Sequence, residues 1–217
     1  MRCAVLVSGS GSNLQALLDA QAAGALAPAE VVLVVSNRPG VAALERAARV
    51  GVPAQVIDHT GFADRAGFEA ALTGALDRAD VGGVVLAGFM RVLTADFVAR
   101  FPRRIVNTHP SLLPAFPGTH AARQALAYGA RVAGCTIHFV DASLDGGPII
   151  TQAPVPILAG DDEAALQRRI QAREHVLLPR VVRALAAGEL GGDGRQVELR
   201  GRAARELGPD GAGAEAA

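Results

Sequence analysis

Residues 3–14 read CAVLVSGSGSNL, an apolar run that leads into a loop of serine and glycine. The run over residues 3–7 is continuously apolar, which is typical of a strand buried on both faces of a parallel sheet. A helix is predicted next, over residues 12–23, with Leu14, Leu17 and Leu18 at the spacing of an amphipathic helix. This stretch therefore predicts a strand–loop–helix unit of a parallel sheet.

The same alternation of short apolar runs and helix-length segments continues along the chain. Helices and strands are predicted in turn until residue 109, where a proline-rich loop begins. We therefore predict an α/β fold, an open, mostly parallel twisted sheet with helices on both faces. The further predicted strands are residues 31–35, 55–57, 84–87, 105–107, 136–140 and 149–156, and the further helices are residues 41–50, 62–78, 94–101, 121–128 and 161–187.

The length of 217 residues exceeds the roughly 150 residues of an average domain and predicts either one large domain or one domain with a short appendage. We place the domain at residues 1–190 and a C-terminal tail at residues 191–217, where glycine, alanine, arginine and glutamate dominate. Within the tail, residues 196–200 are expected to form one edge strand. The chain beyond them is expected to be disordered.

The composition excludes several classes of protein. All 21 basic residues are arginines, so a Walker A loop, a Schiff-base enzyme and a lysine nucleophile are excluded. Two cysteines cannot form a cysteine-rich zinc site or a disulfide framework, and the net charge of +0 gives no overall attraction to nucleic acid. No apolar run reaches 18 residues, and the N-terminus turns polar too early for a signal peptide. We expect a cytoplasmic protein that binds neither membranes nor nucleic acids.

The serine–glycine loop could hold an anion, because its glycines allow a tight turn and the N–H groups of the following helix point at the loop. A dinucleotide fingerprint would need a third glycine where Leu14 stands, and an acidic residue after the second strand, which ends in Ser36 and Asn37. The loop therefore favours a small phosphate ligand at residues 11–13 over NAD. A plain turn capped by Ser12 is the alternative.

A second candidate is the motif NTHPSLLP at residues 107–114, which starts at the carboxyl end of a predicted strand, where open α/β sheets bind ligands. Asn107 and His109 point to the same side of an extended segment. An amide can donate to a developing oxyanion, and a histidine can move protons near pH 7. A hydrogen-bonded structural histidine is the alternative for His109. Asp145 by itself is typical of a turn, and it becomes interesting only as a carboxylate partner of His109.

Four segments in this order resemble those of the phosphoribosylglycinamide formyltransferases: SGSGSNLQ (8–15), AGFMRVL (87–93), NTHPSLLP (107–114) and LDGGP (144–148). The resemblance spans about residues 1–190. It implies the formyltransferase fold, with a Rossmann-like N-terminal half. It also implies an enzyme that transfers the formyl group of 10-formyltetrahydrofolate to the amino group of 5-phosphoribosylglycinamide. The reaction belongs to de novo purine (IMP) biosynthesis and passes through a tetrahedral intermediate.

The resemblance also implies the site residues. The catalytic residues would be Asn107, His109 and Asp145. The substrate phosphoribosylglycinamide would contact Gly11, Ser12, Asn13, Gln171 and Glu174. The cosubstrate 10-formyltetrahydrofolate would contact Arg65, Met90, Arg91, Val92, Leu93, Asn107, Val140 and Asp145. The implied partners are these two small molecules, without a metal, and the chain is expected to be a monomer or a homodimer.

Three other functions stay open. Formyl transfer to methionyl-tRNA would be expected to need an extra C-terminal domain, whereas about 30 residues follow Gly188. Hydrolysis of formyltetrahydrofolate would be expected to come with an N-terminal regulatory domain. A non-catalytic nucleotide-binding module would need the loop at residues 8–13 but not Asn107, His109 and Asp145.

Overall fold

The protein, seen here as a computed structural model, is described at residues 1–208 and 211. The chain divides into two compact units, Met1–Val106 and Asn107–Ala217. We call them the N-terminal and the C-terminal unit.

The N-terminal unit is built from parallel strands and the helices that connect them. The central strand β1 pairs in parallel with β2 on one side and β4 on the other, and β2 pairs in parallel with β3. Residues 3–7 of β1 are fully buried, as their continuous apolar run predicts. The strands are β1 (Arg2–Val7), β2 (Glu30–Ser36), β3 (Ala54–Val56) and β4 (Gly83–Leu86); the helices are α1 (Ser12–Ala22), α2 (Ala42–Arg49), the 3-10 turn His59–Gly61, α3 (Arg65–Arg78) and α4 (Ala95–Ala99).

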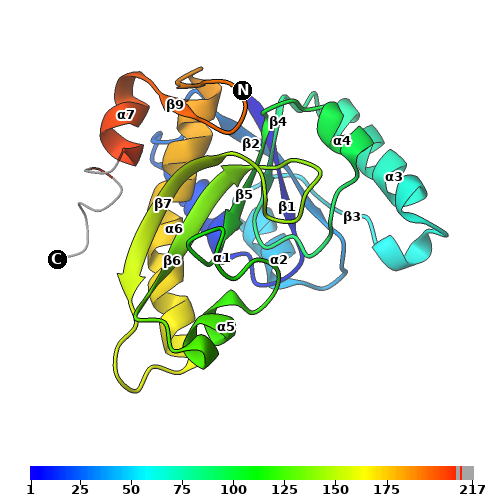
Figure 1. Ribbon diagram of the computed structural model, residues 1–217. Coiled ribbons are helices and arrows are strands. Elements are labelled where there is room, and N and C mark those ends of the chain that lie inside the picture. Colours follow the sequence, from blue (N-terminus) through cyan, green and yellow to red (C-terminus); the bar gives the residue numbers. More distant parts are fainter. Residues whose placement is uncertain (209–210, 212–217) are drawn as a thin grey trace. The chain divides into compact units, whose positions relative to one another are not determined.

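The C-terminal unit combines an antiparallel strand pair with one long helix. Strands β6 (Val132–Phe139) and β7 (Ile149–Pro156) pair antiparallel, and helix α6 (Glu163–Ala186) runs along them (Figure 1). The side chain of Asp162 caps α6 by accepting from the N–H of Ala165. Pro179 lies inside this helix, which continues on both sides of it. Helix α5 (Ala121–Tyr128) has the bounds that the sequence predicts.

The strands of the main sheet follow the order β3-β2-β1-β4-β5-β6-β7, where β5 (Ile105–His109) begins with the last two residues of the N-terminal unit. The pairs within the first four strands are parallel, and β7 is antiparallel to β6. The predicted fold class, an open and mostly parallel α/β sheet, is confirmed.

The tail differs from the prediction. The predicted strand over residues 196–200 shrinks to β9 (Glu198–Leu199), which pairs with β8 (Leu190–Gly191) in a separate two-stranded sheet. The prediction of disorder beyond residue 200 is wrong for residues 201–207, which form helix α7 (Gly201–Leu207).

The tail is ordered here because it packs on the rest of its unit. Ala203 and Leu207 are buried, and the hydroxyl of Thr151 donates to the carbonyl of Leu207 at 2.9 Å. The buried Arg183 holds Glu189 and Glu206. The rest of the predicted disorder falls on residues 209–210 and 212–217, outside the described residues, and the domain boundary at residue 190 stays a prediction. None of the helices in the described part of the chain has the length and apolar character that a membrane crossing needs.

Candidate active site

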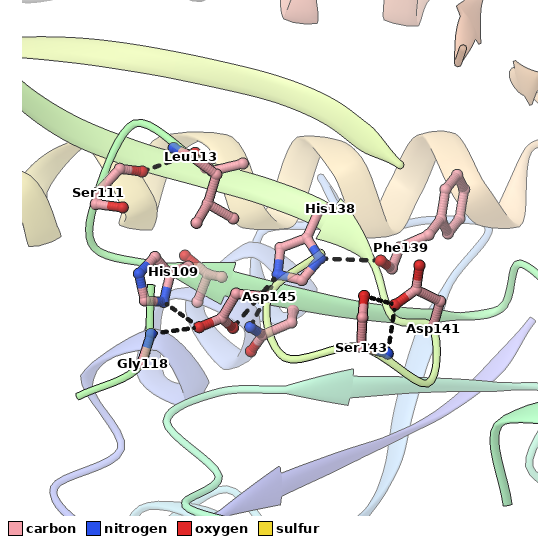
Figure 2. A network of polar contacts seen from close by, with 12 residues as sticks. His109, Ser111, Leu113, Gly118, His138, Phe139, Asp141, Ser143 and Asp145 are labelled. Carbon is pink, nitrogen blue, oxygen red and sulfur yellow. Dashed lines mark hydrogen bonds and ion pairs between the residues drawn. The ribbon is translucent and has the colours of Figure 1, made fainter. Parts of the chain in front are cut away.

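His109, the last residue of β5, faces Asp145 in the C-terminal unit (Figure 2). Its Nδ1 lies 3.4 Å from Oδ2 of Asp145, and its Nε2 lies 2.9 Å from the carbonyl oxygen of Phe116. The side chains of His109 and Asp145 are only 5% and 11% exposed. Carbonyl and carboxylate oxygens can only accept, so the doubly protonated imidazolium form of His109 suits both neighbours.

The loop between β6 and β7 holds Asp145 in place. Oδ2 of Asp145 accepts from the N–H of Gly118 at 2.8 Å, and the backbone of Asp145 is left-handed, with φ 51. Such a conformation costs ~1–2 kcal/mol for a residue other than glycine, although aspartate tolerates it better than most. A Cβ at Gly147 would lie 1.8 Å from the carbonyl oxygen of Phe139. Only glycine therefore lets the loop return so close to β6 and aim Asp145 at His109.

The amide of Asn107 contacts a second histidine, His138 on β6. Nδ2 of Asn107 lies 3.1 Å from Nε2 of His138, whose Nδ1 lies 2.9 Å from the carbonyl oxygen of Phe139. Nε2 of His138 is also 3.9 Å from Oδ1 of Asp145. Burial lowers the pKa of His138, while the Phe139 carbonyl and the Asp145 charge oppose that shift. The three predicted catalytic residues thus lie together with His138.

The proline-rich loop after His109 is fastened to β6 by one threonine. The hydroxyl of Thr136 donates to the carbonyl of Ser111 at 2.7 Å and accepts from the N–H of Leu113 at 3.0 Å. The side chain of Gln152 on β7 donates to the same hydroxyl at 2.9 Å. These bonds fix the start of the loop whose later residues, Phe116 and Gly118, contact His109 and Asp145.

Glu174, a predicted substrate contact on α6, is linked to the same strand through Thr108. The hydroxyl of Thr108 donates to Oε1 of Glu174 at 3.1 Å, and Glu174 is only 3% exposed. Side chains alternate along a strand, so Thr108 points to the opposite face of β5 from Asn107 and His109. Gln171, the other predicted contact on α6, is half-buried one turn before Glu174.

In the N-terminal unit, the predicted phosphate loop depends on Gly11. This residue is left-handed, with φ 72, and a Cβ on it would lie 2.7 Å from Cβ of Ala43 in α2. Gly11 occupies the N-cap position of α1 and makes no side-chain cap bond, so a turn capped by Ser12 is wrong. Arg46 of α2 donates to the carbonyl of Ser10 at 2.8 Å and to the side chain of Gln15 at 3.0 Å. The loop therefore combines the N–H groups of a helix start with a nearby positive charge.

The predicted folate residues of the N-terminal unit differ in exposure. Met90 and Val92 are 58% and 48% exposed, whereas Leu93 is only 4% exposed and belongs to the core. Arg91 is half-buried, and Arg65 is exposed in the first turn of α3. The N–H of Met90 donates to the hydroxyl of Ser8 at 2.8 Å, and this hydroxyl donates to Oδ1 of Asn37 at 2.5 Å. Val140, the remaining predicted folate residue, is half-buried at the end of β6 in the C-terminal unit.

The two cysteines do not offer a nucleophile. Burial raises the pKa of Cys3 to about 11 and that of Cys135 to about 12. Both thiols therefore stay protonated near pH 7, and a thiol is a poor nucleophile in comparison with a thiolate. Within the described residues, no group of three or more histidine, cysteine, aspartate or glutamate residues is placed to hold a metal ion.

The sequence alone does not indicate a role in the site for His138, for the main-chain groups of Phe116 and Gly118, or for Arg46. A histidine on the strand before LDGGP is only weak evidence for a role in the active site, because most histidines on strands are structural. Main-chain contacts leave no trace in residue types. Arg46 lies 35 residues after Gly11 in the sequence, and no local pattern relates the two.

Comparison with known proteins gives a consistent result over most of the chain. The family profile described as formyl transferase matches residues 1–182. The chain is 49% identical over 185 residues to "Phosphoribosylglycinamide formyltransferase" of Mycobacterium tuberculosis, covering 85% of each chain. A solved structure titled glycinamide ribonucleotide transformylase 1, from Symbiobacterium toebii, superposes with a TM-score of 0.90 at 49% identity, covering 93% of this chain and 94% of that one.

The chain also resembles part of a much longer protein. It is 53% identical over 188 residues to "Trifunctional purine biosynthetic protein adenosine-3" of Drosophila melanogaster. This match covers 86% of the chain but only 14% of the length of that relative.

Proposed function

Because the chain belongs to the formyl transferase family, we propose that it transfers the formyl group of 10-formyltetrahydrofolate to the amino group of 5-phosphoribosylglycinamide, a step of de novo purine (IMP) biosynthesis. The observation that carries the proposal is the buried pair of His109 and Asp145 at the end of β5, on the strand that also carries Asn107. Relatives from Mycobacterium tuberculosis and Escherichia coli, matched over most of their own length, are named for this reaction.

The reaction needs a neutral amine, a stabilised oxyanion and a path for one proton. An α-amino group has a pKa of about 8, so roughly a tenth of it is neutral at pH 7 and can attack the formyl carbon. A nitrogen–carbon bond then forms, and the carbonyl electron pair moves to the oxygen. When this tetrahedral intermediate collapses, the bond to the folate nitrogen breaks. A proton from the attacking amine has to reach that nitrogen.

We assign these tasks to three catalytic residues. The Asn107 amide and a protonated His109 stabilise the oxyanion, and the loss of one such donor costs ~3–4 kcal/mol in other enzymes. Asp145, whose carboxylate lies 3.4 Å from Nδ1 of His109, orients this ring and passes the proton on, directly or through water. Nε2 of His109 faces the Phe116 carbonyl, so His109 must exchange this acceptor for the substrate oxygen during the reaction.

We propose two sets of substrate contacts. The phosphate would rest on the main-chain N–H groups of Gly11, Ser12 and Asn13, assisted by the Ser12 hydroxyl. The guanidinium of Arg46, bonded to the carbonyl of Ser10, supports this assignment by adding positive charge to the loop. Further contacts, to the ribose and phosphate, come from two residues of the C-terminal unit, Gln171 and Glu174.

The folate contacts that we propose are of two kinds. The exposed apolar side chains of Met90 and Val92 can pack on the pterin ring, and the exposed Arg65 can pair with the glutamate carboxylates of the cosubstrate. Because Leu93 is buried, its contribution would come from its main chain. The proposed folate set is Arg65, Met90, Arg91, Val92, Leu93, Asn107, Val140 and Asp145.

The remaining proposals concern location, partners and metals. Both cysteines are free and buried, which suits a reducing compartment, and we propose a cytoplasmic location. We propose that the two small molecules are the only partners needed for activity, without a metal ion. A monomer or homodimer stays a prediction.

One assay separates the candidate functions. The purified protein is mixed with 10-formyltetrahydrofolate, and the release of tetrahydrofolate is measured with phosphoribosylglycinamide, with methionyl-tRNA and with neither. We expect release only with phosphoribosylglycinamide. Release with neither acceptor would indicate a hydrolase, and release with methionyl-tRNA alone would indicate a tRNA formyltransferase. No release in any arm would support a non-catalytic module.

A further inference from the structure

His138 lies on a strand of the sheet, and each of its two ring nitrogens contacts a polar group of a neighbouring residue. The residue is 2% exposed, and its ring on β6 lies near Asp145 (Figure 2). Asn107 contacts the same ring. Nδ1 is 2.9 Å from the carbonyl oxygen of Phe139, and Nε2 is 3.1 Å from Nδ2 of Asn107. None of the catalytic steps assigned above uses this ring.

The contact with Phe139 fixes where the ring carries its proton. A carbonyl oxygen can only accept, so Nδ1 must carry the hydrogen. In the neutral ring Nε2 then has a lone pair and accepts from the amide nitrogen of Asn107. Burial lowers the pKa of His138 and so favours the neutral ring.

The state of the ring in turn determines how the Asn107 amide is oriented. An amide side chain can be turned so that either its oxygen or its nitrogen faces a given neighbour. A lone pair on Nε2 accepts only the nitrogen end, whereas a proton on Nε2 would attract the oxygen end. The amide nitrogen carries two hydrogens, and His138 engages one of them, which leaves the second hydrogen for another acceptor.

We propose that His138 is a positioning residue, which selects the nitrogen end of the Asn107 amide and so presents its second N–H to the oxyanion. The kinetic consequence rests on the proposed formyl transfer, while the orientation of the amide does not. His138 itself need not touch either substrate. Its effect therefore passes through Asn107.

The orientation can be tested without any substrate. In the full-length protein labelled with 15N, long-range nitrogen–proton spectra report which ring nitrogen of each of the 5 histidines carries a hydrogen. The signal that disappears in His138→Gln belongs to His138. We expect a hydrogen on Nδ1 and a lone pair on Nε2 at pH 7.5. A hydrogen on Nε2 would overturn the proposal.

The kinetic role is tested with two variants that divide the functions of the ring. Gln at position 138 can place an oxygen near the position of Nε2 and keep the bond with Asn107. Asn is too short for that bond but keeps a donor near the Phe139 carbonyl. We expect His138→Asn to lower kcat by about 10- to 100-fold with both KM values changed less than about threefold, and His138→Gln to stay within about fivefold of wild type. Equal losses in both variants would contradict the proposal.

A double variant distinguishes positioning from a general effect on the fold. If His138 acts through Asn107, adding His138→Asn to Asn107→Ala should change kcat by less than about twofold, because residues that act as a unit are not additive. Losses that multiply would contradict the proposal. The matched control is Thr151→Val, which removes one buried bond from the paired strand β7, and its kcat should equal that of wild type.

The two proposals can fail separately. If the wild-type protein transfers no formyl group to phosphoribosylglycinamide, the proposed function fails, while the nitrogen spectra still decide the orientation of the amide. If the wild type is active but the spectra or the variants disagree with the outcome above, only the role of His138 fails.

Discussion

The loop of residues 8–13 and the cluster around His109 each begin where a buried strand ends, yet they are built in opposite ways. The loop depends on the absence of a side chain, because Gly11 is left-handed and packs against Ala43. The cluster depends on particular side chains from separate segments, Asn107 and His109 from β5, His138 from β6 and Asp145 from the following loop. Damage to the loop should therefore affect binding and stability, whereas damage to the cluster should affect the chemical step.

The largest effect is expected for Asp145→Asn, which removes the charge facing Nδ1 of His109 at 3.4 Å. We expect kcat to fall by ~10²-fold or more, because the carboxylate charge beside the His109 ring and a group of the proton path are both lost. The KM for phosphoribosylglycinamide should change little. Steady-state kinetics with both substrates measures this difference.

The control for this variant is Asp141→Asn on the same loop. The carboxylate of Asp141 accepts from the N–H and the hydroxyl of Ser143, and among the described residues it makes no hydrogen bond to His109 or Asn107. Its kcat should stay within about fivefold of wild type. Near wild-type activity in Asp145→Asn would show that the catalytic assignment of Asp145 is wrong.

The next largest effect is expected for Gly11→Ala, which tests whether damage to the loop affects binding and stability. The added Cβ would lie 2.7 Å from Cβ of Ala43 and 2.9 Å from its Cα, at a φ that favours glycine. We expect the KM for phosphoribosylglycinamide to rise about 10- to 100-fold and the free energy of unfolding to fall by about 1–3 kcal/mol. Kinetics and urea unfolding measure the two quantities.

Gly9→Ala is the matched control, because a Cβ at Gly9 would have no atom within 4 Å. We expect it to resemble wild type in both measurements. If Gly11→Ala raised the folate KM as much as the substrate KM, the damage would be general, and the loop would lose its assignment to the phosphate.

A smaller effect is expected for Thr108→Val, which tests whether Glu174 contributes to substrate binding in the same way as the loop. The variant keeps the shape of the side chain but removes the hydroxyl that donates to Oε1 of Glu174 at 3.1 Å. A bond to a charged group contributes about 1.5–3 kcal/mol, so a partly misplaced Glu174 should raise the KM for phosphoribosylglycinamide by up to about tenfold. A larger loss in kcat than in KM would instead connect Thr108 to the catalytic cluster.

Arg65→Ala should have only a few-fold effect on the KM for 10-formyltetrahydrofolate. Arg65 is exposed at the start of α3, and exposed ion pairs contribute about 1 kcal/mol or less. Arg78→Ala, at the other end of the same helix, is the matched control and should leave this KM unchanged. A loss above a hundredfold would mean that Arg65 has a role beyond an exposed ion pair.

The smallest expected effect is the contribution of His138 to the pH dependence of the free energy of unfolding. The unfolded His138 ring takes up a proton near pH 6.5, whereas burial lowers its pKa in the folded state. The unfolded state then binds more protons, so the free energy of unfolding falls as the pH drops below about 6.5, until the folded pKa is reached. The Phe139 carbonyl and the Asp145 charge oppose the shift, which keeps the effect small.

Urea unfolding of wild type and His138→Gln between pH 8 and pH 5 measures this contribution. The wild-type curve should fall more steeply than that of the variant. Parallel curves would show that His138 titrates alike in both states.

Local patterns in the sequence were sufficient for the sheet and for the candidate residues. The apolar run of β1 predicted a buried strand, and the bounds of α5 and β7 were predicted to the residue. The glycines at residues 9 and 11 predicted a tight turn before α1. Each of these signals depends on neighbours within a few positions, because burial periodicity and the conformational freedom of glycine are local properties.

The composition and motifs also determined which chemistry was open to the chain. The absence of lysine excluded whole classes of enzymes, and four short motifs pointed to one family, to which the chain belongs. The composition and motifs did not determine the position, orientation or protonation of any side chain. His109 and Asp145 are 36 positions apart, and their distance of 3.4 Å depends on how the loop after β6 returns at Gly147.

Only the tertiary structure decided three further matters: that His138 joins Asn107, that Arg46 holds the loop at Ser10, and that α7 forms in the tail. Each results from packing between segments that are distant in the sequence. For α7, the seven residues would be too short to form a stable helix alone, and the burial of Ala203 and Leu207 supplies the missing stability. A sequence states which groups a chain carries, but the distances and burial that set their protonation and orientation arise only when these segments pack together.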